Sequence, residues 1–217
     1  MSQRIYCIIG TGGFGRETFC CLKDCLSFSQ KDIENNAVFM VDDQFYDQPC
    51  VMGLPVIPRS EFLPDRYQVV VAVGNPLDRK EIVNRLPDCT VFASIIHPSA
   101  VISNWVTIGD GSVVTAGTIL TCDITIGKHA HLNLNTTVGH DCTIGDYFTT
   151  APAVNISGKC DIGDCVYIGT NAAVRDKIKI QDNIVIGMGA VVVNDLLLSG
   201  IYMGNPAVFK GKSRSQS

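Results

Sequence analysis

Aliphatic side chains recur at every sixth residue through the second half of the chain, with no gap and no insertion. A period of six fits neither an α-helical repeat nor a simple strand alternation, so each block must combine a short strand with a corner. Such a strict repeat predicts a solenoid in which three blocks make one triangular coil. Sixteen of the seventeen positions in this phase are aliphatic, the exception being Thr150: Ile96, Ile102, Ile108, Val114, Leu120, Ile126, Leu132, Val138, Ile144, Thr150, Ile156, Ile162, Ile168, Val174, Ile180, Ile186 and Val192.

The other positions of each block fit the same coil. The fourth residue after the aliphatic one is usually small or β-branched, as in Ala100, Thr118 and Ala130, and leaves room near the corner. The residue directly after the aliphatic one is often glycine, which we interpret as permitting a turn conformation that side chains resist. Sixteen blocks predict about five coils, and at the ~4.8 Å spacing of neighbouring strands the prism is expected to be roughly 25 Å tall.

The first 95 residues have a different pattern, in which strands alternate with helices and therefore predict a small parallel sheet. We expect a Rossmann-like α/β half domain over residues 1–95, an all-β parallel β-helix over 96–212 and a disordered tail over 213–217. The expected elements of the first domain are strands at Arg4–Ile9, Ala37–Val41, Gln68–Val73 and Val91–Ile95, and helices at Arg16–Ser27 and Pro76–Leu86.

Charge and cysteine usage narrow the class of protein. With 17 basic against 21 acidic side chains and a pI near 5.5, the chain is unsuited to nucleic acid or an anionic membrane. No apolar stretch approaches the length that spans a bilayer, and we expect a cytoplasmic protein. The ten cysteines include no Cys-x-x-Cys pair, so we interpret them as reduced thiols that mostly serve packing, and we expect no metal site.

The segment Gly10-Thr11-Gly12-Gly13-Phe14-Gly15 matches the G-x-G-x-x-G pattern between a predicted strand and a predicted helix. Backbone amides and the helix N-terminus favour a phosphate there, although a tight turn needed only for packing is the alternative. Asp42 follows Gly15 by 27 residues, which is beyond the usual distance for the ribose-binding acid of a dinucleotide site. Because only half of a dinucleotide fold is available, a mononucleotide or a sugar attached to one suits the domain better than NAD.

One histidine is a candidate catalytic base. An acid, Asp141, follows His140 directly, and Asn133 stands one block earlier. His97 precedes Pro98 at the domain junction and is interpreted as structural. The other two histidines, His129 and His131, flank a corner without a defined partner.

Several motifs, each weak alone, together match one family over nearly the whole chain. The chain resembles the bacterial nucleotide-sugar acetyltransferases of the PglD/NeuD type, and the resemblance implies a left-handed β-helix and a homotrimer. The matching segments are Ile9-Gly10-Thr11-Gly12-Gly13-Phe14-Gly15, Val41-Asp42-Asp43, Ala72-Val73-Gly74-Asn75, Ile96-His97-Pro98-Ser99-Ala100, Gly139-His140-Asp141-Cys142-Thr143-Ile144-Gly145 and Gly204-Asn205-Pro206-Ala207.

The resemblance also implies a role for each candidate residue. It makes His140 the general base, Asp141 its orienting partner and Asn133 a neighbouring active-site residue. The residues implied for acetyl-CoA, the co-substrate, are Gly158, whose amide faces the thioester carbonyl, and Asn205, Pro206 and Ala207 in the C-terminal coils. Those implied for the nucleotide sugar are Gly10, Gly12, Gly13, Phe14, Gly15, Asp42, Asp43, Gly74 and Asn75. Thr149 departs from the family, because relatives often carry a second histidine there.

The resemblance predicts transfer of an acetyl group from acetyl-CoA to the amine of a nucleotide-linked 4-amino-dideoxy sugar, in the synthesis of bacterial surface-glycan precursors. Direct attack by the amine requires no cysteine nucleophile. The alternatives are an O-acetyltransferase acting on a sugar such as sialic acid, a metal-dependent hydratase resembling γ-class carbonic anhydrases through His129, His131 and His140, and a sensor that binds the nucleotide sugar without turnover. UDP, dTDP and GDP stay open as the nucleotide, as does the sugar carbon that bears the amine.

Overall fold

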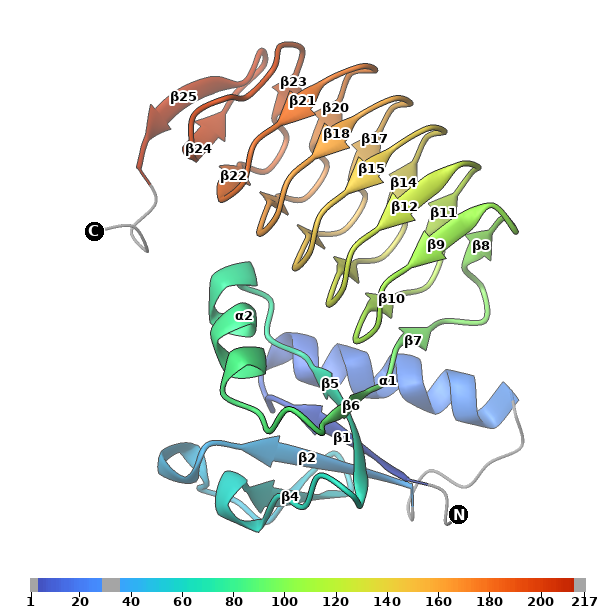
Figure 1. Cartoon of the computed structure of the whole chain (residues 1–217), viewed down its shortest axis with the longest axis vertical. Coiled ribbons are helices and arrows are strands. Elements are labelled where there is room, and N and C mark those ends of the chain that lie inside the picture. The colour runs from blue at the N-terminus through green and yellow to red at the C-terminus, as the bar shows by residue number, and fades with distance from the viewer. Residues whose placement is uncertain (1–3, 29–35, 213–217) are drawn as a thin grey trace.

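The computed structural model describes residues 4–28 and 36–212. Two regions follow each other along the chain, an α/β region and a solenoid, and Figure 1 shows the solenoid stacked above the α/β region. The predicted tail at 213–217 lies outside the described residues.

The α/β region is a six-stranded sheet in the order β3-β4-β2-β1-β5-β6, parallel except for the pairing of β3 with β4. The sequence predicted β2 with its observed bounds but indicated neither β3 nor β4. The elements are β1 (Ile5–Ile9), α1 (Gly13–Phe28), β2 (Ala37–Val41), η1 (Asp43–Phe45), β3 (Cys50–Val51), β4 (Leu54–Pro58), η2 (Arg59–Glu61), β5 (Tyr67–Val71), α2 (Pro76–Asn84) and β6 (Val91–Phe92).

The solenoid has three parallel walls, which we call first, second and third in chain order. The first wall comprises β7 (Ile95–Ile96), β10 (Val113–Val114), β13 (His131–Leu132), β16 (Thr149–Thr150), β19 (Tyr167–Ile168), β22 (Ile184–Ile186) and β24 (Gly200–Met203), with β25 (Val208–Gly211) added antiparallel. The second comprises β8 (Val101–Ile102), β11 (Ile119–Leu120), β14 (Thr137–Val138), β17 (Asn155–Ile156), β20 (Ala173–Val174) and β23 (Val191–Val192). The third comprises β9 (Val106–Ile108), β12 (Ile124–Ile126), β15 (Thr143–Ile144), β18 (Asp161–Ile162) and β21 (Lys179–Ile180).

The six-residue phase forms the core of this prism, as predicted. Every residue of the phase from Val114 to Val192 is buried, including Thr150. Ile96 is 42% exposed, because it belongs to the first coil and no coil precedes it. The five complete coils of the described residues agree with the number that the repeat predicts. The strand predicted at Val91–Ile95 is wrong in one respect, since it divides into β6 of the sheet and β7 of the first wall.

The glycines of the repeat have a different role from the predicted one. From Ile108 to Ile186, the corner residues with positive φ are the third after each residue of the phase, and most are not glycine, as in Asp141 (φ 59) and Lys159 (φ 62). The glycines directly after the aliphatic residue are instead sites of close stacking. A Cβ atom on Gly139 would lie 2.6 Å from the backbone nitrogen of Gly158 in the next coil. A side chain there would push neighbouring coils apart.

The α/β region covers the first wall from β7 to β16. The Cys25 thiol of α1 lies 3.1 Å from the Ile96 carbonyl oxygen, and the α/β core continues into Ile95 and Val113 of the first wall. The second and third walls are left uncovered in one copy of the chain (Figure 1). Neither described helix has the length and apolarity needed to cross a bilayer.

Candidate functional site

The predicted catalytic pair lies at the second corner, which joins the second wall to the third. The Nδ1 atom of His140 is 2.7 Å from Oδ2 of Asp141, and the two side chains are 56% and 48% exposed. Asp141 has a left-handed backbone (φ 59), and its N–H donates to the Cys122 carbonyl one coil below at 3.1 Å. The repeat therefore fixes the backbone of the pair, while the imidazole remains open to solvent.

Gly158 lies one coil above His140, on the same corner. A Cβ atom at Gly158 would be 2.8 Å from both Cε1 and Nε2 of the imidazole. The next residue, Lys159, donates its N–H to the His140 carbonyl at 2.7 Å. The imidazole thus lies directly against the Gly158 backbone, in a space that only glycine leaves free.

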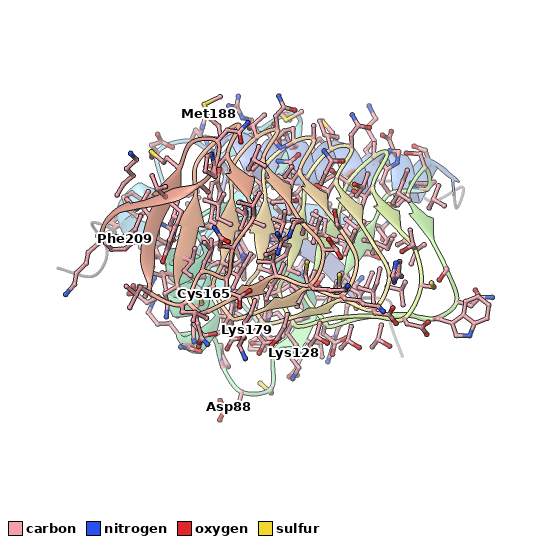
Figure 2. All side chains as sticks on the ribbon, turned by 90° about the horizontal axis from the view of Figure 1, so that it is seen from above. Asp88, Lys128, Cys165, Lys179, Met188 and Phe209 are labelled. Atoms are coloured by element: carbon pink, nitrogen blue, oxygen red, sulfur yellow. The ribbon has the colours of Figure 1, made fainter. Side chains whose placement is uncertain are left out.

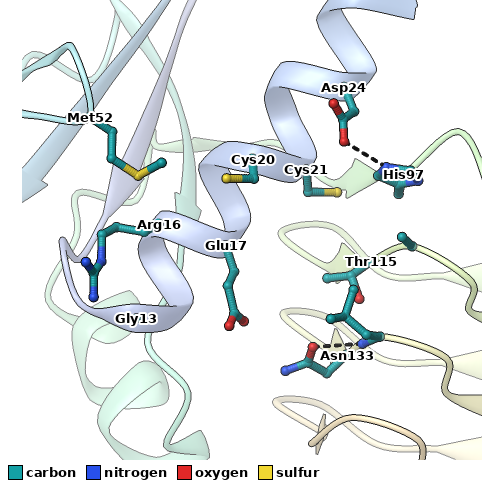
Figure 3. A pocket seen from close by; sticks show the side chains of 12 residues that line it. Gly13, Arg16, Glu17, Cys20, Cys21, Asp24, Met52, His97, Thr115 and Asn133 are labelled. Atoms are coloured by element: carbon teal, nitrogen blue, oxygen red, sulfur yellow. Dashed lines mark hydrogen bonds and ion pairs between the residues drawn. The ribbon is translucent and has the colours of Figure 1, made fainter.

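Asn133 lies at the first corner, between the first and second walls, and faces the α/β region. It lines a cavity of about 470 Å³ between α1 and the solenoid, opposite Gly13, Glu17 and Cys20 of the helix (Figure 3). Its Oδ1 atom accepts the Leu134 N–H at 2.7 Å. The size of this cavity is within the range of small-molecule sites.

The glycine-rich loop combines two packing glycines with two open ones. A Cβ atom on Gly15 would lie 1.9 Å from the Gly10 carbonyl oxygen, and one on Gly10 would lie 3.2 Å from the Ala72 carbonyl oxygen. By contrast, Gly12 and Gly13 have nothing within 4 Å of such an atom. Because α1 begins at Gly13, the open glycines lie at its N-terminus, where backbone amides favour an anion. Both the packing and the phosphate interpretations of this loop therefore have support, at different residues.

The acidic pair after β2 lines a separate cavity of about 360 Å³. Asp42 forms ion pairs with Arg59 (3.3 Å) and Arg85 (3.6 Å). The side-chain hydrogen bond from Ser60 lowers the pKa of Asp43. This cavity offers a ligand guanidinium groups as well as carboxylates.

Gly74 lines a cavity, whereas Asn75 caps a helix. Asn75 is the N-cap of α2, since its Oδ1 atom accepts the Leu77 N–H at 2.9 Å. Gly74 lines a cavity of about 280 Å³ together with Phe14 of α1, Asn133 of the first corner, and His131 and Thr149 of the first wall. The glycine-rich loop and the loop after β5 thus open onto the solenoid at the same place.

The residues predicted for acetyl-CoA lie along the second wall. Asn205, Pro206 and Ala207 form the turn between β24 and β25, and the Ala207 N–H donates to the carbonyl of Val191 in β23 at 2.8 Å. Gly158 lies beside the same wall at the second corner, with β20 and β23 between it and the turn.

The structure does not bring all predicted catalytic residues together in one copy. Asn133 and the glycine-rich loop lie at the first corner, whereas His140 and Gly158 lie at the second corner, across the width of the second wall. Sequence spacing missed this separation, because Asn133 and His140 are only seven residues apart.

Two histidines without a predicted partner both contact Arg79, His131 through its ring and His129 through its backbone carbonyl. Both His129 and His131 are buried under the α/β region beside the guanidinium of Arg79, which the sequence did not single out. Burial, and then the charge of Arg79, lower the pKa of His129 to about 4 and that of His131 well below its usual value. The sequence did not predict this polar cluster on the first wall, because nothing in it distinguishes the buried Arg79 from the neighbouring basic residue Lys80.

Within residues 4–28 and 36–212, no three His, Cys, Asp or Glu side chains converge as metal ligands. The histidines considered for a hydratase lie apart, since His140 is exposed at the second corner while His129 and His131 are covered by the α/β region. The buried pair is therefore not available to a metal shared with another copy.

Comparisons with known proteins agree with the fold along the whole chain. Residues 6–86 match the family model described as the PglD N-terminal domain. WeeI from Acinetobacter baumannii AYE is 30% identical, with a TM-score of 0.86, over 96% of this chain and 100% of its own. The comparison with curated protein sequences gave no match.

Two further solved structures carry ligands. PerB from Caulobacter crescentus, in complex with CoA and GDP-perosamine, is 29% identical over 97% of this chain and 99% of its own, with a TM-score of 0.85. The acetyltransferase domain of PglB from Neisseria gonorrhoeae FA1090, in complex with acetyl coenzyme A, is 28% identical over 96% of this chain and 100% of its own, with a TM-score of 0.84. With its α/β region, its left-handed hexapeptide-repeat β-helix and these relatives, the chain belongs to the PglD/NeuD-type family of nucleotide-sugar N-acetyltransferases.

Proposed function

We propose that the chain transfers the acetyl group of acetyl-CoA to the amino group of a nucleotide-linked amino sugar, with His140 as the general base. The observation that carries the proposal is the His140–Asp141 pair, held open to solvent directly against the Gly158 backbone. Among the relatives, PerB is described with CoA, which is the product left by the acetyl donor in this reaction, and with GDP-perosamine, a nucleotide-linked amino sugar. Both substrates are cytoplasmic metabolites, and we place the reaction in the cytoplasm.

The chemistry follows from the orientation of the imidazole. Because Nδ1 faces the Asp141 carboxylate, Nε2 is the nitrogen available to accept a proton from the attacking amine. The amine attacks the thioester carbonyl and gives its proton to His140, the C–S bond then breaks, and the thiolate of CoA leaves and takes that proton from the imidazolium. The backbone N–H of Gly158 is our candidate donor to the oxyanion that forms between these steps.

The nucleotide sugar is proposed to bind between the α/β region and the first corner. The open amides at Gly12 and Gly13 suit its diphosphate, and the cavity lined by Asn133 suits its sugar. The cavity lined by Asp42 and Asp43 is our candidate for the nucleobase, together with Arg59 and Arg85.

The active site is proposed to form between copies in a homotrimer. The second wall is apolar on its outer face at the N-terminal end, where Val101 is 61% and Ile119 is 41% exposed. When second walls of neighbouring copies turn toward a common axis parallel to the prism, the first corner of one copy lies beside the second corner of the next. Asn133 and the bound sugar of one copy would then meet His140 of its neighbour.

Acetyl-CoA is proposed to run along the second wall, from Gly158 to the turn at Asn205, Pro206 and Ala207. Basic side chains follow the second corner above His140, and they suit the phosphates of CoA. These are Lys159, Arg175 and Lys177.

The test is thiol release from acetyl-CoA against a panel of UDP-, dTDP- and GDP-linked amino sugars, with the matching hydroxy sugars as controls. We expect turnover with at least one amino sugar and none with its hydroxy counterpart. Turnover with hydroxy sugars alone would favour the O-acetyltransferase, and tight sugar binding without thiol release would favour the sensor.

The trimer has a separate test. Light scattering at low micromolar concentration should give about three times the chain mass of 23.4 kDa. Ile119→Glu should weaken the assembly and the activity together, because it places a charge on the proposed interface. An active monomer would overturn the shared site.

A further inference from the structure

Arg79 of α2 is fully buried, yet its guanidinium points out of the α/β region and into the solenoid. Its donors reach the backbone of the third corner, two side chains of the first wall, and the loop that follows β5. The acceptors are the carbonyl oxygens of His129 (3.0 Å), Tyr147 (2.7 Å), Phe148 (3.3 Å), Val73 (2.7 Å) and Gly74 (3.4 Å), with Nδ1 of His131 (3.0 Å) and Oγ1 of Thr149 (2.7 Å).

The guanidinium has no acidic partner. None of the described carboxylates lies within ion-pair distance of Arg79. Burial lowers the pKa of Arg79 to about 9, so the group is still protonated at neutral pH. Because arginine only donates, Nδ1 of His131 must be unprotonated, and the imidazole is neutral. Arg79 therefore acts as a fork of hydrogen-bond donors, a geometry that a lysine ammonium does not reproduce.

The same cluster holds both loops that open onto the nucleotide site. Thr149 accepts from Arg79 and lies 3.4 Å from the Gly74 carbonyl oxygen, to which its hydroxyl donates. The ring of His131 packs 4.5 Å from the ring of Phe14 in the glycine-rich loop. The two loops are thus fixed to adjacent coils of the solenoid, β13 and β16, and not only to the sheet from which they emerge.

We infer that Arg79, with His131 and Thr149, positions the nucleotide-binding loops against the solenoid and thereby sets where the amino sugar meets the acetyl group. The inference rests on the proposed function. In this arrangement Arg79 touches neither substrate and acts through the loops. Thr149, where relatives often carry a histidine, then serves as an acceptor for Arg79 and has no direct part in the chemistry.

The experiment separates the two substrates. Arg79→Lys keeps the charge but loses the fork, and we expect at least a tenfold rise in KM for the nucleotide amino sugar that the wild type uses. The dissociation constant of acetyl-CoA, measured by calorimetry, should stay within about twofold, because its proposed site lies on the second wall. Thr149→Val removes one acceptor of Arg79 and the hydroxyl that donates to the Gly74 carbonyl, and it should raise the same KM about threefold. This variant keeps the test decisive if Arg79→Lys does not fold.

Lys80→Ala is the matched control. Lys80 is the next residue of α2 and lies 5.6 Å from the Tyr147 ring, at the same interface but outside the cluster, so we expect less than a twofold change in either constant. If the folded Arg79→Lys and Thr149→Val enzymes keep the wild-type KM for the sugar, or weaken both substrates equally, the positioning role is wrong. A wild-type chain that neither binds nor acetylates any nucleotide amino sugar would overturn the proposed function and the positioning role together.

Discussion

His140 and His131 belong to the same coil, nine residues apart, and their environments are opposite. His140 is 56% exposed at the second corner, and its partner is the carboxylate of Asp141. His131 is fully buried on the first wall, and its partner is the guanidinium of Arg79. The Asp141 carboxylate can accept the Nδ1–H of the exposed ring and orient it, whereas burial beside a cation keeps the His131 ring neutral. The partner and the exposure of the ring, more than the residue type, separate a candidate base from a structural histidine.

The solenoid repeat explains how both environments arise from one pattern. His140 at the second corner faces solvent, while the outward positions on the first wall from β7 to β16 are covered by the α/β region (Figure 2 shows the solenoid over that region from above). The repeat supplies equivalent backbone positions, and the neighbouring region then decides which of them stay open.

The largest expected effect on turnover comes from removing the exposed histidine, His140. His140→Ala should lower kcat by roughly 10²–10⁴-fold, the usual contribution of a general base, because it removes the proposed acceptor of the amine proton. Acetyl-CoA affinity should be nearly unchanged. Thr125→Ala, on the open third wall, is the control for surface substitution. Retention of more than about a third of wild-type turnover would remove His140 from the mechanism.

The buried histidines near Arg79 should make the free energy of unfolding depend on pH in the acidic range. Burial, and then Arg79, lower the pKa of His129 in the folded chain from 6.5 to about 4. Between pH 6.5 and 4, His129 is therefore protonated in the unfolded chain but not in the folded chain. The stability that is present above pH 6.5 is lost as the pH falls toward 4. The contribution is about 3 kcal/mol.

Urea unfolding between pH 4 and 7.5 measures this effect. His129→Asn does not titrate and tolerates the left-handed backbone at this residue (φ 56), so its free energy of unfolding should fall less steeply with acid. An unchanged slope in this variant would show that His129 is not held neutral by the fold.

The contrast between the two histidines also marks what the sequence could predict. Asp141 adjoins His140 in the chain, and the six-residue phase places both on a corner, so this pair was visible as a motif. The buried cluster joins Arg79 to His131 and Thr149 across 52 and 70 residues, and no local pattern encodes such contacts. The separation of Asn133 from His140 was missed for a related reason, because six residues turn the chain onto the next wall.

The fold was more predictable than the site, because its signals are periodic. The buried phase of the prism and the strand β2 were predicted from hydrophobic spacing, which reflects burial directly. The strands β3 and β4 were not indicated, since β3 has only two residues at the edge of the sheet and β4 (Leu54–Pro58) contains two prolines, which are atypical of strands. The glycines after the aliphatic residues were predicted to permit a turn conformation, but glycine is needed there because neighbouring coils stack closely. The sequence alone does not distinguish these two requirements.

A smaller expected effect comes from moving the exposed imidazole without removing it. In Gly158→Ala the added methyl group would lie 2.8 Å from Nε2 of His140, so the ring must turn away. Gly158 does not have positive φ, and the exposed ring has space to move, so the fold should persist. We expect kcat to fall by about thirtyfold with little change in the thermal midpoint, by analogy with the loss of a positioned base. Wild-type turnover would mean that the ring is not used where it lies.

The smallest expected effect concerns the carboxylate that distinguishes the exposed histidine from the buried one. Asp141→Asn keeps an oxygen that can accept the Nδ1–H of His140, so the orientation of the ring is retained while the charge is lost. Because the Asp141 side chain is 48% exposed, water screens its charge, and the stabilisation of the imidazolium is smaller than in a buried triad. We expect kcat to fall by about five- to tenfold, less than in either His140→Ala or Gly158→Ala, with KM for both substrates unchanged.

Steady-state kinetics of Asp141→Asn beside Asp141→Ala make the comparison decisive, since the alanine removes orientation as well as charge and should lower kcat further. Equal rates for the two variants would mean that orientation by Asp141 contributes nothing, and that any loss they share comes from the missing charge.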